Sequence, residues 1–371
     1  MAQAAQGLGG LKYDPSKRAR APELNIFLAL VGIVVMFELL GRLIIGDSFL
    51  FNTRDNVDTI FNNQRLTIII LQVSTVGIIA IGVTQVIIAG GIDLSSGSVV
   101  GATAMVAMSF AQTALVNGNP NPKAIFGDWA MDLPVLVPIV VGLGVGLIAG
   151  LINGLLIAYT KIPPFIATLG MMVTARGFAR WWSTGNPISF PTQSYANLAN
   201  GDFVGWLTFG LFSWKGINPV LIFVGLAILF HLIMRYTKYG KHSYAIGSNE
   251  AAARMSGINV DRHKVLVYVI AAMLAALAAI VVSSKNVTAQ AAMGVMYELD
   301  AIAMAVIGGV ALSGGRGSIL GTVLGALIFG VIISGFTFLK LDAYYQEMVK
   351  GVIIVAAVVL DQWRQRSRAK G

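Results

Sequence analysis

The chain contains no cysteine, and only 12% of its 371 residues are charged. The lack of cysteine excludes disulfide bonds and thiolate metal sites. The three histidines, His231, His242 and His263, lie too far apart in the sequence to form a local metal-binding motif. Soluble domains carry roughly a quarter charged residues, whereas 56% of the residues here are apolar. The composition therefore indicates an integral membrane protein.

Long apolar runs divide the sequence into segments that can each cross a membrane. Residues 66–94 contain a single charged residue, Asp93, and about 20 apolar residues are enough to cross the hydrocarbon core. We predict an all-α, polytopic membrane protein in which residues 1–371 form one domain with about ten transmembrane segments. The predicted spans are residues 24–45, 66–89, 97–116, 134–159, 164–182, 217–235, 265–284, 299–312, 317–339 and 345–361.

Basic residues supply the net charge of +9 and gather in three places: the N-terminal tail, residues 235–264 and the C-terminal tail. Clusters at the ends of apolar runs follow the positive-inside rule, so all three are expected on the cytoplasmic side. Residues 1–23 and 362–371 are then cytoplasmic tails, and residues 237–264 form a cytoplasmic loop. This distribution argues against nucleic acid as a partner.

Three common nucleotide-binding and catalytic motifs are absent. The sequence contains no G-x-x-x-x-G-K-[ST] phosphate loop, no H-E-x-x-H and no G-x-S-x-G. Such motifs bind nucleotide phosphates, bind zinc or present a nucleophilic serine. We therefore expect any ATP hydrolysis to occur on a separate chain, and we expect this chain to hold no cofactor and no metal.

A glycine-rich pattern occurs twice in the sequence. The stretch GGIDLS at residues 90–95 resembles GGVALS at residues 308–313, and GSVVG at 97–101 resembles GSILG at 317–321. We interpret the pattern as an internal repeat with discontinuous helices. Glycine-broken apolar segments in two halves point to a transport pathway, since irregular backbone inside a membrane must lie beside protein or water. Tight turns between adjacent helices explain the pattern equally well.

Acidic residues inside or beside the spans are the strongest polar signals, because a buried carboxylate in a membrane needs a partner or a cavity. Asp93 precedes a predicted helix start, where it can cap free N–H groups. The same choice between capping and cargo contact holds for Glu298 and Asp300. Asn153 either bonds a neighbouring helix or lines a path.

Two further patterns predict helix contacts. Gly142, Gly146, Gly150 and Gly154 recur every fourth residue, which places four glycines on one helix face and permits close helix packing. Glu38 and Arg42 have the i, i+4 spacing of an ion pair on one helix face.

The stretch from Tyr239 to Lys264 is the most informative polar region. Ser248 or Asn249, followed by Glu250 and an alanine run, predicts a capped short helix that ends near Gly257. Such a helix between two spans suits docking onto another protein, and a solvated connector is the alternative.

Six stretches together resemble the permease subunits of bacterial ABC importers for monosaccharides, the group for ribose, galactose, xylose and inositol. They are residues 89–95, 152–155, 164–170, 239–257, 297–303 and 313–315. The resemblance implies a pair of permeases in the lipid bilayer, an ATPase subunit that binds ATP and Mg, and an extracytoplasmic sugar-binding protein. It also implies that Glu250, Ala251, Ala252 and Gly257 belong to the loop that docks into the ATPase, and we add Gly247, Asn249 and Arg254.

These observations predict a transport subunit that moves a monosaccharide or sugar-like polyol across the bacterial inner membrane by alternating access, with both termini cytoplasmic. The residues expected to line or shape its pathway are Asp93, Ser95, Ser96, Asn153, Phe165, Glu298 and Asp300. An ion-coupled secondary sugar carrier that acts without an ATPase is the first alternative, and a passive channel is the second. The scarcity of ionisable residues within the spans counts against the carrier.

Overall fold

The computed structural model describes residues 22–51, 60–208, 213–342, 344–353, 355–356 and 359. Within these residues nearly all regular structure is helical, and the strands are four two-residue segments. The all-α fold expected from the sequence is confirmed. The tails expected at residues 1–23 and 362–371 lie almost entirely outside the described residues.

The described helices follow one another along the chain in numbered order. They are α1 (Pro22–Leu40), α2 (Asn63–Ile88), α3 (Ser96–Ser109), α4 (Leu136–Tyr159), α5 (Pro164–Trp182), α6 (Gln193–Asn200), α7 (Phe203–Leu207), α8 (Asn218–Tyr236), α9 (Lys238–Ser248), α10 (Glu250–Met255), α11 (Val260–Asn286), α12 (Tyr297–Ile307) and α13 (Ile319–Phe338). The π-helical turn η1 (Gly41–Ile45) extends α1, and η2 (Asp128–Ala130) is a short 3-10 turn.

The strands form two antiparallel pairs. β1 (Leu115–Val116) pairs with β2 (Asn119–Pro120), and β3 (Ile188–Ser189) pairs with β4 (Thr288–Ala289). The second pair aligns Ile188 with Ala289, so it joins the segment that follows α5 to the segment that follows α11.

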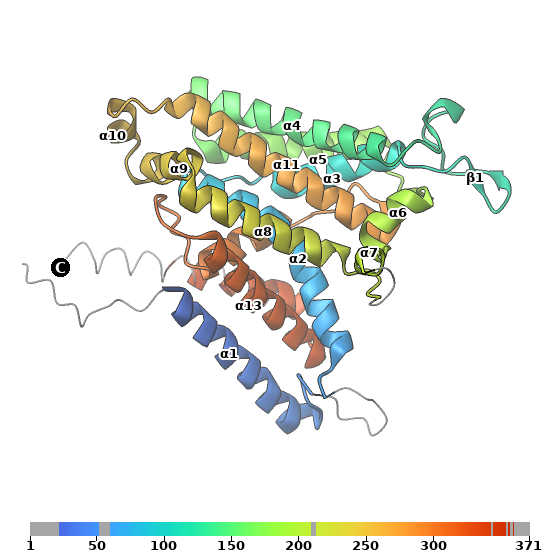
Figure 1. Cartoon of the computed structure of the whole chain (residues 1–371), viewed down its shortest axis with the longest axis horizontal. Helices are drawn as coiled ribbons and strands as arrows, with labels where there is room; N and C mark the ends of the chain where they lie inside the picture. Colours follow the sequence, from blue (N-terminus) through green and yellow to red (C-terminus); the bar gives the residue numbers. More distant parts are fainter. Residues whose placement is uncertain are drawn as a thin grey trace, which may run out of the picture.

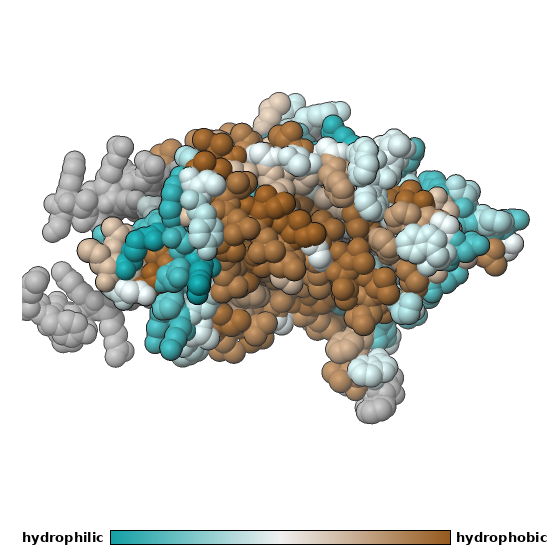
Figure 2. Space-filling model, turned by 90° about the horizontal axis from the view of Figure 1, so that it is seen from above, coloured by the Kyte–Doolittle hydropathy of each residue, from teal (hydrophilic) through white to brown (hydrophobic). Residues whose placement is uncertain are grey.

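Polar surfaces lie at two opposite ends of the molecule. α9, α10 and the beginning of α1 lie at one end, which we call the α10 end, and β1, α6 and α7 lie at the other, the β1 end (Figure 1). Figure 2 shows a broad apolar band between two hydrophilic ends. This band is the surface that a membrane-spanning helical protein presents to lipid.

Six of the described helices are long and apolar enough to cross a membrane: Glu23–Ile45, Arg65–Ile88, Leu136–Tyr159, Asn218–Tyr236, Val260–Asn286 and Ile319–Phe338. These match six of the ten predicted spans. α5 occupies the predicted residues 164–182 but contains Arg176 and Arg180. Residues 344–353 are helical, and most of the remainder of the span predicted to residue 361 lies outside the described residues.

Two predicted spans are too long. Within the span expected at residues 97–116, helix α3 ends at Ser109, and the chain then leads into β1. Within the span expected at residues 299–312, helix α12 ends at Ile307, because Gly308 and Gly309 close it. α3 and α12 are therefore half-length helices.

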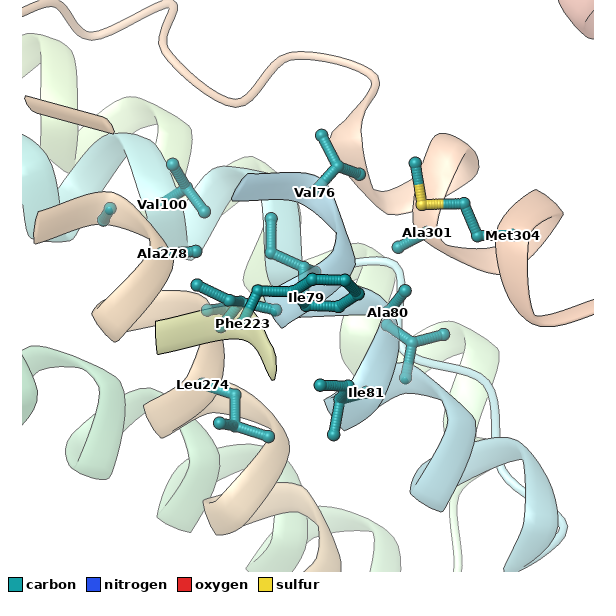
Figure 3. Packing of buried hydrophobic residues seen from close by; sticks show 14 of the residues in the cluster. Val76, Ile79, Ala80, Ile81, Val100, Phe223, Leu274, Ala278, Ala301 and Met304 are labelled. Carbon is teal, nitrogen blue, oxygen red and sulfur yellow. The ribbon is translucent and has the colours of Figure 1, made fainter. Parts of the chain in front are cut away.

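The core consists of helices that are buried on nearly all sides. α2 packs against α8, α11, α12 and α13, and every residue of α3 is buried. Figure 3 shows the apolar contacts at the centre, where side chains of α2 meet those of α3, α8, α11 and α12: Val76, Ile79, Ala80, Ile81, Val100, Phe223, Leu274, Ala278, Ala301 and Met304.

The glycine face predicted in the span at residues 134–159 is confirmed on α4. A Cβ added to Gly150 lies 2.6 Å from the Cα of Val269, and one added to Gly154 lies 2.8 Å from the Cα of Val265. Both of these neighbours belong to α11. Only glycine permits the two helix backbones to approach this closely.

The ion pair predicted within the first span is also confirmed. Arg42 Nε donates to Glu38 Oε1 at 2.7 Å. The same carboxylate accepts the N–H groups of Phe49 and Leu50 at 2.9 and 3.0 Å, so Glu38 anchors the turn that follows α1.

Candidate functional site

The first glycine break connects α2 to α3. α2 ends where Gly90 N–H donates to the carbonyl of Ile87 and Gly91 N–H donates to that of Val86, each at 2.9 Å. Gly90 has φ of +82°, a left-handed conformation that glycine adopts without strain. This pair of bonds is a Schellman motif, which satisfies the last free carbonyls of a helix. The chain then continues without regular structure to Ser95.

The second break repeats this turn after α12. Gly309 N–H donates to the carbonyl of Val306 at 2.9 Å, Val310 N–H donates to that of Ala305 at 3.0 Å, and Gly309 has φ of +84°. The internal repeat is therefore structural. Its register differs from the sequence match by one residue, because the backbone aligns Gly90 with Gly309 rather than with Gly308.

Both breaks meet at Gly247, near the end of α9. Gly315 N–H donates to the carbonyl of Ile88 at 2.9 Å. A Cβ added to Gly247 overlaps the carbonyl oxygen of Ile88 and lies 2.5 Å from the nitrogen of Gly315. The two breaks thus lie side by side at the α10 end, and Gly247 connects both to the segment that carries α10.

Asp93 holds the start of α3 in place. Its Oδ1 accepts the N–H of Ser95 at 2.8 Å and the hydroxyl of Ser95 at 2.6 Å. Ser95 is the N-cap residue of α3, so Asp93 fixes the cap residue rather than capping the helix itself. Asn153 of α4 donates to the Ser95 hydroxyl at 2.9 Å. Of the two options for Asn153, the structure shows the bond to a neighbouring segment.

Buried polar atoms without a hydrogen-bond partner among the described residues gather around this helix start. They include Asp93 Oδ2, Ser96 Oγ, Ser98 Oγ, Asn153 Oδ1, Tyr268 OH and Glu298 Oε2. All six of these atoms are acceptor oxygens or hydroxyls, which suit the hydroxyl groups of a neutral molecule. Among the described residues, no group of three acidic or histidine side chains is placed to hold a metal ion.

Glu298 approaches the same helix start from α12. A Cβ added to Gly97 overlaps Glu298 Oε2 and lies 3.2 Å from its Cδ, so the carboxylate packs directly on the first turn of α3. α12 begins at Tyr297, and the starts of the two half-length helices therefore meet inside the molecule.

Arg176 of α5 stabilises this meeting point and was missed by the sequence analysis. Its guanidinium donates to the carbonyls of Ala291 and Met293 at 2.7 and 2.9 Å and to that of Gly97 at 3.3 Å. An arginine in the middle of a predicted span is the signal that identifies it, because a buried cation requires several acceptors.

Asp300 lies apart from this cluster. Its Oδ2 accepts a bond from Lys350 Nζ at 3.1 Å, and Lys350 belongs to the helical residues 344–353. The carboxylate therefore joins α12 to the last described helical segment. Sequence analysis did not identify Lys350, although a lysine in an apolar run is the same kind of signal as Arg176.

Phe165 is the one predicted pathway residue on the surface, with 51% of its area exposed. It lies near the start of α5, at one edge of a broad exposed side of that helix; Gly170 and Gly177 lie within this side and Thr174 lies at its other edge. A Cβ added to Gly170 or Gly177 meets no atom within 4 Å. This face of α5 is open along much of its length.

The short helix predicted in the loop at residues 237–264 is α10. Asn249 caps it by accepting the N–H of Ala252 at 3.0 Å, and Gly257, with φ of +82°, closes it. Glu250, Ala251 and Arg254 lie on the helix, and Met255 beside them is 85% exposed. Lys264 donates to Glu250 and holds the pKa of that carboxyl below its usual value.

Comparison with known proteins gives one family. Residues 65–358 match the family model described as branched-chain amino acid transport system / permease component. No solved structure matches the chain significantly.

Several relatives cover most of the chain. The ribose import permease of Escherichia coli is 36% identical over 306 residues, which is 82% of this chain and 88% of that protein. The ribose import permease of Bacillus subtilis is 39% identical over 295 residues, or 78% and 82% of the two chains. The galactose/methyl galactoside import permease of Escherichia coli is 34% identical over 307 residues, or 82% and 88%. This chain therefore belongs to the family of membrane transport permease components that the model describes.

Proposed function

We propose that this chain is the transmembrane permease subunit of an ATP-binding-cassette importer that moves a monosaccharide or sugar-like polyol across the bacterial inner membrane. The observation that carries the proposal is the contact of Gly247 with both breaks. It connects α9, which leads directly into the exposed helix α10, to the end of α2 and to the second break. A partner that moves α10 thereby acts on the interior of the permease.

The α10 end is cytoplasmic in this proposal. Arg235, Lys238, Lys241, Arg254, Arg262 and Lys264 lie in or beside α9 and α10, and cytoplasmic segments carry an excess of lysine and arginine. α1 begins at the same end (Figure 1), which supports a cytoplasmic N-terminus, and we propose that the C-terminus is cytoplasmic as well. The ATPase, with its ATP and Mg, docks on α10, and the sugar-binding protein docks at the β1 end.

The pathway residues other than Asp300, which pairs with Lys350, divide into two groups. Asp93, Ser95, Ser96, Asn153 and Glu298 are buried within one chain, so we assign them to the wall that shapes the path. Phe165 lies on the open face of α5. Small residues on a lipid-exposed face favour packing against another helix, and we assign this face to the second copy of a permease pair and to the path between the copies.

A cysteine scan tests the pair, because the chain contains no cysteine. Gly177→Cys on α5 is expected to form a disulfide-linked dimer in native membranes on oxidation. Val224→Cys, on the exposed face of α8, is the matched control and should stay monomeric. A dimer only through Val224→Cys would place the interface on α8 instead.

Reconstitution tests the function. The chain is placed in proteoliposomes with its ATPase and binding protein, and accumulation of ribose, galactose, xylose, inositol and leucine is measured with and without ATP. We expect concentrative, ATP-dependent uptake of a sugar or polyol. Uptake driven by an ion gradient without ATP would identify a secondary carrier, and flux that does not concentrate the solute would identify a channel. Accumulation of leucine alone would assign an amino acid cargo.

A further inference from the structure

Five charged side chains form one connected network at the α10 end. Arg254 donates to both carboxylate oxygens of Asp261, Nη1 to Oδ2 at 3.0 Å and Nη2 to Oδ1 at 2.9 Å. Lys161 Nζ donates to the same carboxylate. On the other side, Glu250 accepts from Lys264 Nζ at 2.7 Å and pairs with Arg254 at 3.4 Å.

Asp261 is the centre of this network because of its place in α11. Asn259 caps that helix by accepting the N–H of Arg262 at 3.1 Å, which puts Asp261 in the first turn. A carboxylate in the first turn is favoured by the helix dipole. Asp261 is therefore held by its own helix while it binds cations from two other segments.

Lys161 comes from the turn between α4 and α5. It has φ of +60°, and it lies two residues after the end of α4 and three before the start of α5. Pro163 and Pro164 open α5. Because proline fixes φ, few backbone torsions between Lys161 and α5 are free to change, so a displacement of Lys161 also displaces the beginning of the helix.

Among the described residues, α10 packs mainly against its neighbours along the chain, α9 and α11. α9 and α8 precede α10, and α11 follows it. α5, whose open face we assign to the path, is separated from α10 in the sequence by α6, α7, α8 and α9. The bond between Lys161 and Asp261 is the described charged link from the α10–α11 corner to the beginning of α5.

An isolated surface ion pair contributes little to stability, but bidentate arginine pairs and networks are the exceptions. Here the arginine is bidentate and the carboxylate is shared by cations of two segments. The network therefore restricts the positions of α10, α11 and the α4–α5 turn relative to one another. A single ion pair between two long, exposed side chains would not restrict them in this way.

We propose that Arg254, Asp261 and Lys161 form a strut that transmits movement of α10 to the beginning of α5. Lys161 and Asp261 are positioning residues: they touch neither ATP nor cargo, and they act through α5. The proposal rests on the proposed function, in which an ATPase moves α10. It adds a second route into the permease beside the contact of Gly247 with the breaks.

The test removes the charge of Lys161 and measures the geometry directly. Spin labels on Tyr159→Cys, at the end of α4, and Ser256→Cys, after α10, report the distance between the two corners in nanodiscs. We expect one narrow distance distribution for the parent chain, with and without the ATPase and nucleotide. Lys161→Gln should broaden the distance distribution and make it depend on nucleotide. Lys161→Arg, which keeps the positive charge, should restore the narrow distribution.

Transport is measured in parallel on the same variants in the complex with ATPase and binding protein. Lys161→Gln should lower uptake per ATP hydrolysed by at least about fivefold, the lower limit of typical couplings between sites, with copurification of the ATPase unchanged. Lys241→Gln, an exposed lysine of α9, is the matched control and should behave as the parent.

The two proposals fail in different ways. An unchanged distance distribution in Lys161→Gln would overturn the strut, whatever the transport activity. A lack of ATP-driven uptake by the parent complex would overturn the proposed function, while the distances of the labelled chain would still decide whether the strut exists.

Discussion

The two glycine breaks begin alike and end differently. Each closes a helix with a Schellman motif around a glycine of positive φ, at Gly90 and at Gly309. After the first break the chain runs to a helix that is buried along its whole length, and Asp93 fixes the residue at which that helix starts. After the second break Ser318 caps α13 directly by accepting the N–H of Gly321 at 3.0 Å.

The difference explains the aspartate that only one half of the repeat contains. A helix that starts in the interior has no water to satisfy its first N–H groups, so its cap residue must be held by other side chains. Asp93 and Asn153 do this for Ser95. Ser318 needs less support and also donates to Glu23 at 3.1 Å. The glycines therefore make the turn, and the aspartate serves the buried restart.

The largest expected effect comes from Gly247→Ala, which disturbs both breaks together. The added methyl group overlaps backbone atoms of Ile88 and crowds Gly315, and backbone cannot rotate away as a side chain does. We expect a loss of stability near the upper end of the roughly 1–3 kcal/mol typical of overpacking, measured as a lower melting temperature in detergent.

The control for this variant is Gly225→Ala on α8, where an added Cβ meets no atom within 4 Å. It should leave the melting temperature unchanged or raise it slightly, because alanine favours helix over glycine by about 1 kcal/mol. Equal melting temperatures for both variants would show that Gly247 does not join the breaks.

A smaller effect is expected at the first break alone. Asn153→Ala removes the donor to Ser95, and a buried hydrogen bond contributes about 0.5–1.5 kcal/mol. Hydrogen exchange at the start of α3 should accelerate, while exchange at the start of α13 stays unchanged. Equal acceleration at both helices would contradict a separate role for Asn153 in the first break.

The smallest effect is expected at the second break. Ser318→Ala removes the cap of α13, and loss of a serine cap lowers stability by roughly 1 kcal/mol or less where water can replace it. Protection of α13 should fall by only a few fold in hydrogen exchange, with α3 unaffected. Global unfolding on this substitution would show that the second break needs its cap as much as the first.

Local features were predictable from the sequence because they depend on neighbouring residues. Six long spans follow from apolar runs, α10 follows from its asparagine cap and glycine stop, and the pair of Glu38 and Arg42 follows from spacing. The four-residue glycine period of α4 predicted a packing face, although not that α11 covers it.

Contacts between distant segments were not predictable. Nothing in the sequence near Gly247 indicates that it meets Ile88 and Gly315, because that contact depends on how three loops fold together. The register of the repeat was misassigned by one residue, since backbone conformation, not residue identity, aligns the turns. Arg176 was overlooked because its partners are carbonyl groups, which every residue carries.

The most direct test of this account compares Asp93→Ala with Asp93→Asn in both melting temperature and sugar uptake. The account predicts that Asp93→Ala melts at a clearly lower temperature, because the N–H and hydroxyl of buried Ser95 lose their acceptor, and that Asp93→Asn, which keeps an oxygen at Oδ1, retains most stability and uptake. Parent-like melting temperatures for both variants together with abolished uptake would contradict it, and would assign Asp93 to the cargo instead.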